Sequence, residues 1–220
     1  MIEVLEYTKN PLNTIGVAAG ACWNSSREDV DKNIKRAIEC IENNHGRVLE
    51  YVDVTLIISE RSARVIREWY THKIGTTNVH ESTRYVNCKN FEYFTPNKIK
   101  NNEEAKKIYD NVMKNIAESY QQLLDLKIPR EDVANILPLG MNTKIVTKIN
   151  LRALIHMFEI RTCTRAYHEY RDLMKELKDT LATLDGEWKY ICDNFLKTKC
   201  EKTGCCDEKY TCGRFPQKEK

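Results

Sequence analysis

The sequence lacks an uninterrupted apolar segment of membrane-spanning length, and its first residues do not join a basic stretch to an apolar one. We therefore expect no membrane contact and no secretion signal, which predicts a cytoplasmic protein. A strong charge of either sign is also missing, because 35 Lys and Arg residues face 32 Asp and Glu residues, for a net charge of +3. A general nucleic-acid binder needs a stronger basic field, so we expect no nucleic-acid partner.

What is present is an ordinary globular composition, with 41% hydrophobic and 30% charged residues in a chain of 220. That length is enough for one compact domain with a large core. Nine cysteines are many for this length. Without a secretion signal, they are expected to be reduced thiols or metal ligands rather than a disulfide framework. The composition changes to Lys, Cys and Gly beyond Leu196, which predicts a domain over 1–196 and a Cys-rich tail over 197–220.

Apolar residues recur at helical spacing in much of the chain, and β-branched runs separate the helical segments. Together they predict an α+β (mixed α/β) fold, a single domain with a central β-sheet flanked by helices and with long helices in the second half. The expected helices cover 29–44, 61–71, 103–126, 150–160 and 166–183, with a short one opening at Pro129. The expected strands cover 48–59 and 143–149, with short strands within 84–94 and a loop over 75–81.

Cationic side chains gather along the helix expected to begin near Asn150. Arg152 and His156 are four residues apart and so share a face, and Arg161 and Arg165 follow at the same spacing. Three arginines and a histidine without matching acids predict an anion site. A solvated surface face or an ion-pair network explains the same spacing and stays open.

A second polar segment, from Thr71 to Tyr85, joins His72 and Lys73 to a loop rich in Ser, Thr and Asn that ends at Arg84. Small hydroxyl residues expose backbone N–H groups, and an arginine can hold a phosphate with two parallel hydrogen bonds. The glycines of a Walker loop or a dinucleotide fingerprint are missing. The segment predicts a phosphate or nucleotide loop, with an ordinary capped turn as the alternative.

The two segments together resemble the conserved stretches of flavin-dependent thymidylate synthases. The first resembles the signature RHRxxSxNxxSxR, with one extra residue between Asn78 and Ser82. The second resembles a stretch with an LP turn, a strand entering N-x-R-x-L, and a helix ending near R-x-C-x-R-A. The resemblance covers nearly the whole chain in order. The matching residues are His72, Asn78, Ser82, Arg84, Leu137, Pro138, Thr143, Lys144, Asn150, Arg152, Leu154, Arg161, Cys163, Arg165 and Ala166, with His45 and Glu50 upstream.

The resemblance implies a homotetrameric enzyme that makes dTMP from the nucleotide dUMP. Methylenetetrahydrofolate would give the one-carbon unit, and NADPH would reduce the FAD that delivers a hydride to the pyrimidine. By position, Arg161 is the expected catalytic residue, in contact with the uracil. The expected substrate-binding residues are Arg161 with Glu68, Glu81, Ser82, Thr83 and Arg84, and the expected cofactor-binding residues are Arg47, Glu50, His72, Lys73, Ile74, Asn150, Arg152, His156 and Arg165.

The chain departs from that pattern near the expected nucleotide. Thr71 and Lys73 stand where the signature has arginines, Glu68 stands where glutamine usually contacts the pyrimidine, and Ala134 stands where an arginine helps to hold the nucleotide. Lysine cannot reproduce a planar guanidinium. These departures keep two alternatives open: a related flavin enzyme that modifies another pyrimidine nucleotide, and a non-catalytic flavin or nucleotide binder.

Cysteines pose two further questions. Cys163 is a candidate nucleophile because Arg161 and Arg165 can lower the pKa of its thiol, but its flanking residues favour a structural thiol. Four cysteines of the tail form the pattern C-x4-C-C-x5-C, which predicts a zinc site although paired C-x2-C units are missing. Exposed free thiols or a disulfide formed under oxidation are the alternatives. The predicted zinc ligands are Cys200, Cys205, Cys206 and Cys212.

Overall fold

The computed structural model describes residues 1–218, which form two compact units. The first unit contains Met1, Ile57–Thr71 and Asn78–Val146. The second unit contains Ile2–Leu56, His72–Thr77 and the described chain from Thr147 onward. The predicted division at residue 196 does not coincide with these units and stays a prediction.

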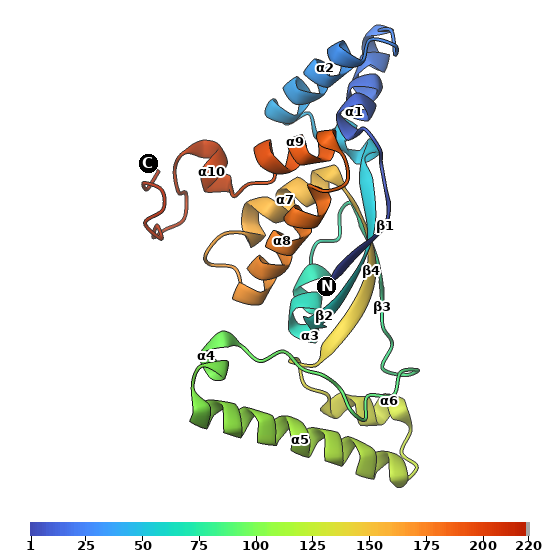
Figure 1. Cartoon of the computed structure of the whole chain (residues 1–220), viewed down its shortest axis with the longest axis vertical. Coiled ribbons are helices and arrows are strands. Elements are labelled where there is room, and N and C mark those ends of the chain that lie inside the picture. The colour runs from blue at the N-terminus through green and yellow to red at the C-terminus, as the bar shows by residue number, and fades with distance from the viewer. Residues whose placement is uncertain (219–220) are drawn as a thin grey trace. The chain divides into compact units, whose positions relative to one another are not determined.

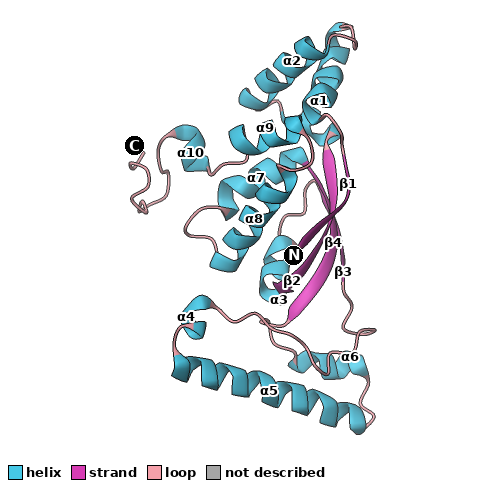
Figure 2. Ribbon diagram, in the orientation of Figure 1, coloured by secondary structure: helices cyan, strands magenta, loops and turns pink. Residues whose placement is uncertain are grey.

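One four-stranded sheet has the order β1-β2-β4-β3 (Figure 2). Strands β1 and β2 are antiparallel, because Ser59 N–H bonds to Met1 O at one end of β1 and Thr8 N–H bonds to Asp53 O at the other. The bonds at the ends of β4 show the same direction for its pairings with β2 and β3: Ala63 N–H to Met141 O, Leu151 N–H to Val52 O, Glu81 N–H to Lys144 O and Asn150 N–H to Gly75 O. Along β4, alternate residues from Thr143 to Ile149 are buried, as expected for a strand with one face on the core. The strands are β1 (Ile2–Tyr7), β2 (Asp53–Ser62), β3 (Thr76–His80) and β4 (Asn142–Asn150).

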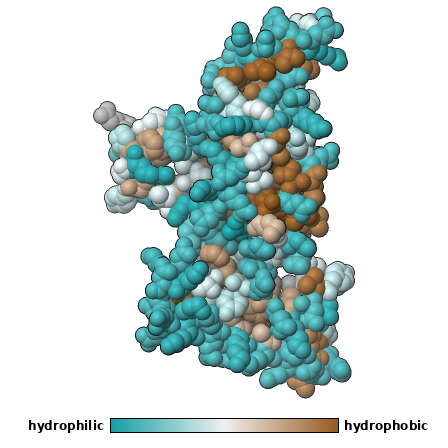
Figure 3. Space-filling view, in the orientation of Figure 1, coloured by the Kyte–Doolittle hydropathy of each residue, from teal (hydrophilic) through white to brown (hydrophobic). Residues whose placement is uncertain are grey.

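The first helices of the second unit are α1 (Pro11–Gly20) and α2 (Val30–Glu42). The 3-10 turn η1 (Ala21–Trp23) lies between them, and the 3-10 turn η2 (Gly46–Tyr51) follows α2. The two helices approach closely at Gly16, where a Cβ atom would lie 2.0 Å from the carbonyl oxygen of Asn33. Apolar side chains gather over this helix pair (Figure 3). Asp29 caps α2 by accepting a hydrogen bond from Lys32 N–H.

The later helices of the second unit are α7 (Leu151–Arg161), α8 (His168–Leu181), α9 (Gly186–Asn194) and α10 (Lys199–Thr203). Helices α7, α8 and α9 group on one side of this unit's strands (Figure 1). Phe158, Tyr170 and Trp188 are almost wholly buried there. The indole N–H of Trp188 donates to Thr8 O at 2.9 Å, so its polar atom is satisfied inside the core.

The first unit contains α3 (Ala63–Trp69), α4 (Asn97–Lys100), α5 (Glu103–Asp125), α6 (Arg130–Val133) and the 3-10 turn η3 (Ala134–Ile136). Asn102 caps the long helix α5 by accepting from Ala105 N–H. The helix buries Tyr120 against Cys88, Val133 and Met141. No helix within residues 1–218 has the length and apolar character needed to cross a membrane.

The α+β prediction is confirmed, but three local predictions are wrong. Residues 46–51 form a 3-10 turn rather than the start of a strand, and 76–80 form β3 rather than a loop. Segment 84–94 contributes only the isolated bridge Tyr93–Met141 within the described chain. Strand β3 is polar because it lies at the sheet edge, where a half-exposed strand does not need an apolar pattern.

Candidate active site

A hydrogen bond joins two predicted site residues of the second unit that are 89 positions apart in the chain. Arg161, the last residue of α7, donates from Nε to Nε2 of His72 at 3.0 Å. The guanidinium carbon of Arg161 also lies 4.8 Å from the centre of the Tyr170 ring, which is a cation–π distance. The His72 ring lies 6.2 Å from the His156 ring and 6.5 Å from the Tyr170 ring, centre to centre. Two predicted cofactor residues and the predicted catalytic residue therefore form one cluster.

The charge state of His72 follows from this packing. Burial is the largest cause, followed by the positive charge of Arg161 and then by His156, and together they lower the pKa of His72 to about 4. At neutral pH the ring is therefore uncharged, which leaves a lone pair on Nε2 to accept from Arg161. Sequence reasoning did not identify Tyr170, because an aromatic residue at helical spacing also marks an ordinary core position.

The predicted cofactor residues Arg47, Glu50 and Arg152 also meet in the second unit. They line a cavity of about 440 Å³, and Arg152 Nη1 donates to Glu50 Oε1 at 2.6 Å. Gly46 makes this approach possible, because a Cβ there would lie 2.7 Å from Arg152 Nε. Glu50 comes from η2 and Arg152 from α7, so the pair links the turn to the helix.

A second cavity of about 760 Å³ takes in the same face of α7. Arg152 and His156 line it, and both side chains are more than half exposed. Lys197, Lys199 and Lys202 add three cations, two of them paired with acids of the same unit. The cavity is large and is lined by charges of both signs, because Glu42, Glu159 and Glu201 lie beside these cations. Its cations could pair with a diphosphate group.

The Asn150 side chain caps the start of α7. Its side-chain oxygen caps the helix by accepting from Ala153 N–H at 2.9 Å, and its backbone N–H donates to Gly75 O at 2.9 Å. Gly75 has a φ of 76°, and a Cβ there would lie 2.5 Å from Asn150 Oδ1. The turn before Gly75 presents Lys73 and Ile74, both exposed, with Ile74 at 86%.

The expected substrate residues other than Arg161 belong to the first unit. Glu81 N–H bonds to Lys144 O and so continues the β3–β4 pairing. Arg84 is exposed and lies 2.9 Å from Glu131, while its backbone N–H bonds to Ser82 Oγ at 3.3 Å. Glu68 on α3 and Thr83 complete this set and are half-buried. Thr71, at an arginine position of the signature, donates from its hydroxyl to Glu68 O at 2.7 Å.

Two expectations about the arginines are wrong. Helix α7 ends at Arg161, so Arg165 lies in the following loop and does not continue its helical face. Matching acids are also present: Glu50 pairs with Arg152, and Glu208 lies 3.6 Å from Arg165. Sequence spacing could not show these partners, because they come from distant segments of the second unit. Arg165 further bonds to Tyr210 O, which makes it a contact of the tail.

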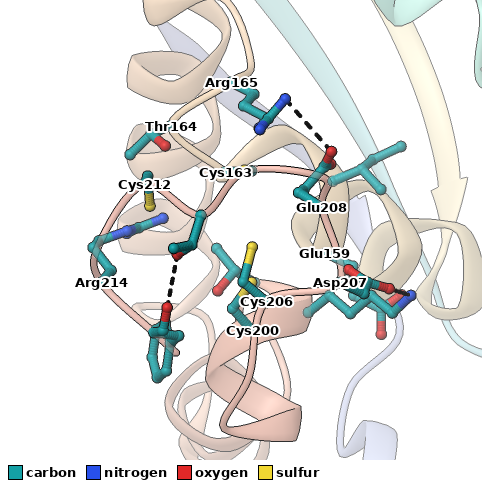
Figure 4. A pocket seen from close by; sticks show the side chains of 15 residues that line it. Glu159, Cys163, Thr164, Arg165, Cys200, Cys206, Asp207, Glu208, Cys212 and Arg214 are labelled. Atoms are coloured by element: carbon teal, nitrogen blue, oxygen red, sulfur yellow. Dashed lines mark hydrogen bonds and ion pairs between the residues drawn. The ribbon is translucent and has the colours of Figure 1, made fainter. Parts of the chain in front are cut away.

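The structure does not support the predicted zinc site. Within residues 1–218 no three His, Cys, Asp or Glu side chains come close enough to hold a metal ion. Cys200, Cys206 and Cys212 line one cavity together with Cys163, whereas Cys205 is directed to Thr203, with its Sγ 3.8 Å from the hydroxyl oxygen. The side chains of Cys200 and Cys206 lie next to each other in this cavity (Figure 4).

The architecture defines an α+β protein built on an antiparallel sheet, with cation-lined cavities along α7. Residues 3–184 match the family model described as "Thymidylate synthase complementing protein", and the chain belongs to this family. It is 28% identical to the flavin-dependent thymidylate synthase of Nitratidesulfovibrio vulgaris, over 99% of this chain and 96% of that one. It is also 28% identical to that of Pyrococcus furiosus, over 94% and 89%.

The fold of this chain is also similar to that of a solved structure. The flavin-dependent thymidylate synthase ThyX of Helicobacter pylori, complexed with FAD and dUMP, has a TM-score of 0.69 at 25% identity. The likeness covers 89% of this chain and 99% of that one. The fold and nearly the full length of these relatives are therefore shared.

Proposed function

We propose that this chain is a flavin-dependent thymidylate synthase, which makes dTMP from dUMP. Methylenetetrahydrofolate is the one-carbon donor and NADPH the reductant. The observation that carries the proposal is the cluster at the end of α7, where Arg161 is held by a neutral His72 and by the Tyr170 ring. A homotetramer and a cytoplasmic location are part of the same proposal.

The residues present fit FAD. A diphosphate needs exposed cations and hydrogen-bonding groups beside a roomy cavity. Along the cavity of about 760 Å³, Arg152 supplies a cation and His156 a ring nitrogen. Because residue 46 is a glycine, it leaves room for the Arg152 side chain, which a Cβ atom there would meet at 2.7 Å. When bound, FAD supplies the hydride. The residues proposed to hold it are Arg47, Glu50, His72, Lys73, Ile74, Asn150, Arg152, His156 and Arg165.

Arg161 is proposed to bind the uracil ring and to stabilise the negative charge that develops on it. A guanidinium stays protonated, and it carries five N–H donors in a fixed plane. His72 engages the donor at Nε and, being neutral, does not remove the positive charge. A preorganised donor aimed at developing charge contributes on the order of 3 kcal/mol to the transition state.

The other residues proposed to bind the nucleotide are Glu68, Glu81, Ser82, Thr83 and Arg84. Arg84 lies beside Glu131 on the surface, so a phosphate must compete for its guanidinium. Ser82 is close to the Arg84 backbone and offers a hydroxyl donor to the same phosphate.

A second candidate function is favoured by Glu68. Its carboxylate accepts hydrogen bonds but donates none, which suits the exocyclic amino group of a cytosine ring better than a uracil carbonyl. Thr71 bonds to the backbone of Glu68, so it stabilises the end of α3 and brings no positive charge. A related enzyme acting on deoxycytidylate is therefore the alternative, with a non-catalytic binder as the third possibility.

One set of measurements separates these functions. The purified protein should show a flavin absorption band and should convert dUMP to dTMP when methylenetetrahydrofolate and NADPH are supplied. The same assay with deoxycytidylate and uridylate measures base preference. Product from deoxycytidylate alone would favour the second candidate, and FAD binding without product from any nucleotide would favour the third. Light scattering tests the homotetramer.

A further inference from the structure

Four cysteines line one cavity of about 350 Å³ in the second unit, and the proposed function uses none of them. Cys163 lies in the loop after α7, Cys200 in the first turn of α10, and Cys206 and Cys212 in the tail (Figure 4). Packing alone does not require these thiols, because a small apolar residue fills the same space, so their reactivity is the property to consider.

Two of these thiols lie next to each other. Cys200 and Cys206 both line the cavity, and Figure 4 shows their side chains side by side. Their interaction contributes to the raised pKa of Cys200. Gly204 brings the chain back on itself, because it ends α10 with a φ of 72° and its N–H bonds to Cys200 O. The turn is what carries Cys206 to Cys200 across only five intervening residues.

The neighbouring cysteines have other partners. Cys205, next in sequence to Cys206, directs its Sγ to the Thr203 hydroxyl. Cys212 is hydrogen-bonded to Thr164 and Arg214, and these bonds lower the pKa of its thiol to about 7. The geometry therefore distinguishes Cys206 from Cys205, which the sequence pattern alone cannot do.

We propose that Cys200 and Cys206 form a thiol–disulfide exchange site, which closes to an intramolecular disulfide by reaction with a small soluble disulfide. Cys200 attacks one sulfur of the small disulfide, so a mixed disulfide forms and one small thiol leaves. Cys206 then attacks the Cys200 sulfur, which forms the Cys200–Cys206 bond and releases the second small thiol. Two protein thiols are oxidised and one small disulfide is reduced to two thiols, so atoms and electrons balance.

Access favours Cys200 as the attacking residue, because it is partly exposed to the cavity while Cys206 is 5% exposed. The thiolate is the attacking form. Burial, Cys206, Cys163 and Asp207 raise the pKa of Cys200 to about 11. Closure is therefore slow at pH 7 and accelerates as the pH is raised towards 9.

The bond would fix a segment that engages a proposed cofactor residue. The backbone of Cys206 pairs with Pro216 and Lys218, which anchors the tail. Between these anchors, Glu208 and Tyr210 hold Arg165. Closing the disulfide therefore ties α10 to the tail that binds Arg165.

The test uses the full chain with Cys212→Ser, because the Cys212 thiolate would otherwise react first with the oxidant. The protein is incubated with oxidised glutathione at pH 8, free thiols are alkylated, and trypsin cuts after Lys199, Lys202 and Lys209. The peptide with Cys200 should be disulfide-linked to the peptide with Cys205 and Cys206. Excess dithiothreitol should release the link.

The matched variants are Cys205→Ser and Cys206→Ser, added singly to the same protein. The link should persist with Cys205→Ser and disappear with Cys206→Ser. A link that is lost with Cys205→Ser, or glutathione adducts without any linked peptide, would overturn the proposal. The Cys205→Ser result decides alone if Cys206→Ser fails to fold, because Cys206 is then the only cysteine left in its peptide. The outcome does not depend on the proposed enzyme activity.

Discussion

The Nε atom of Arg161 lies 3.0 Å from the Nε2 atom of His72, so a permanent cation donates to a ring that its own charge helps to keep neutral. The arrangement fixes the guanidinium without neutralising it. A carboxylate in the place of His72 would fix Arg161 as firmly but would compete with an anionic ring for its charge.

Arg161→Ala should fold and retain FAD but lose most of its turnover. The lost stabilisation of about 3 kcal/mol corresponds to a drop of roughly a hundredfold or more in kcat. Arg161→Lys should recover little, because an ammonium cannot reproduce the planar set of donors. Turnover of Arg161→Ala close to that of the unaltered protein would show that Arg161 only stabilises the end of α7.

The pKa of His72 should be close to 4, as measured by NMR titration of its ring. Because this value is below the ordinary 6.5, the unfolded chain binds the proton more tightly than the folded one. The contribution of His72 to stability is therefore complete above pH 6.5 and is lost as the pH falls from 6.5 to 4. Arg161→Met should raise the pKa of His72 only in part, because burial is the larger cause. An unchanged pKa in that variant would contradict the coupling.

Tyr170 should position Arg161 through its ring. Tyr170→Phe keeps the ring and should retain most of the turnover. Tyr170→Leu removes the cation–π contact, worth about 1 kcal/mol, and leaves a void in the core. We expect it to lower turnover severalfold while FAD is still bound. Equal kcat values for the two variants would show that the ring has only a packing role.

Gly75→Ala should destabilise the protein more than Gly204→Ala, although both residues have a φ above 70°. The backbone strain costs roughly 1 kcal/mol at either position. At Gly75 the new Cβ also lies 2.5 Å from Asn150 Oδ1, whereas nothing lies within 4 Å at Gly204. Urea unfolding of the two variants measures the difference in the free energy of unfolding. Equal losses of stability would show that the Asn150 side chain can move away from the new Cβ without destabilising the protein.

Cys163→Ala should retain flavin and most of its turnover, because hydride transfer from FAD needs no protein nucleophile. Cys163 lines the cavity of the tail cysteines. A fall of turnover to background in a variant with normal folding and flavin content would revive Cys163 as the nucleophile.

The sequence predicts well those helices and strands that bury one face along many residues. The apolar period of α5 and α7 placed these helices within one or two residues of their observed ends. Strand β3 was missed because an edge strand can be polar. Strand β1 and helices α1 and α9 were not predicted, since their burial depends on contacts such as that between Trp188 and Thr8, 180 residues apart.

In the candidate site, too, local motifs predicted some residues, whereas partners from distant segments were missed. Motif positions predicted that Glu50, Arg152 and His156 belong near a cofactor, and the structure brings Arg152 together with each of the other two along its cavities. Tyr170 and the tail residue Glu208 were missed, because neither carries a local signal for the arginine that it contacts. Partners across the chain come from packing, and a single sequence does not encode them in its spacing.

Helix α7 also fixes the distance between two of the proposed ligand-binding arginines. Arg161 follows Arg152 by nine positions, so at a rise of 1.5 Å per residue their backbones are about 13.5 Å apart along the axis. A compact ion cannot reach both. A molecule that contacts both ends of α7 would be elongated, with one part near Arg152 and another near Arg161. The spacing of the two arginines along the helix would then favour a ligand of matching length, whatever the chemistry of its single contacts.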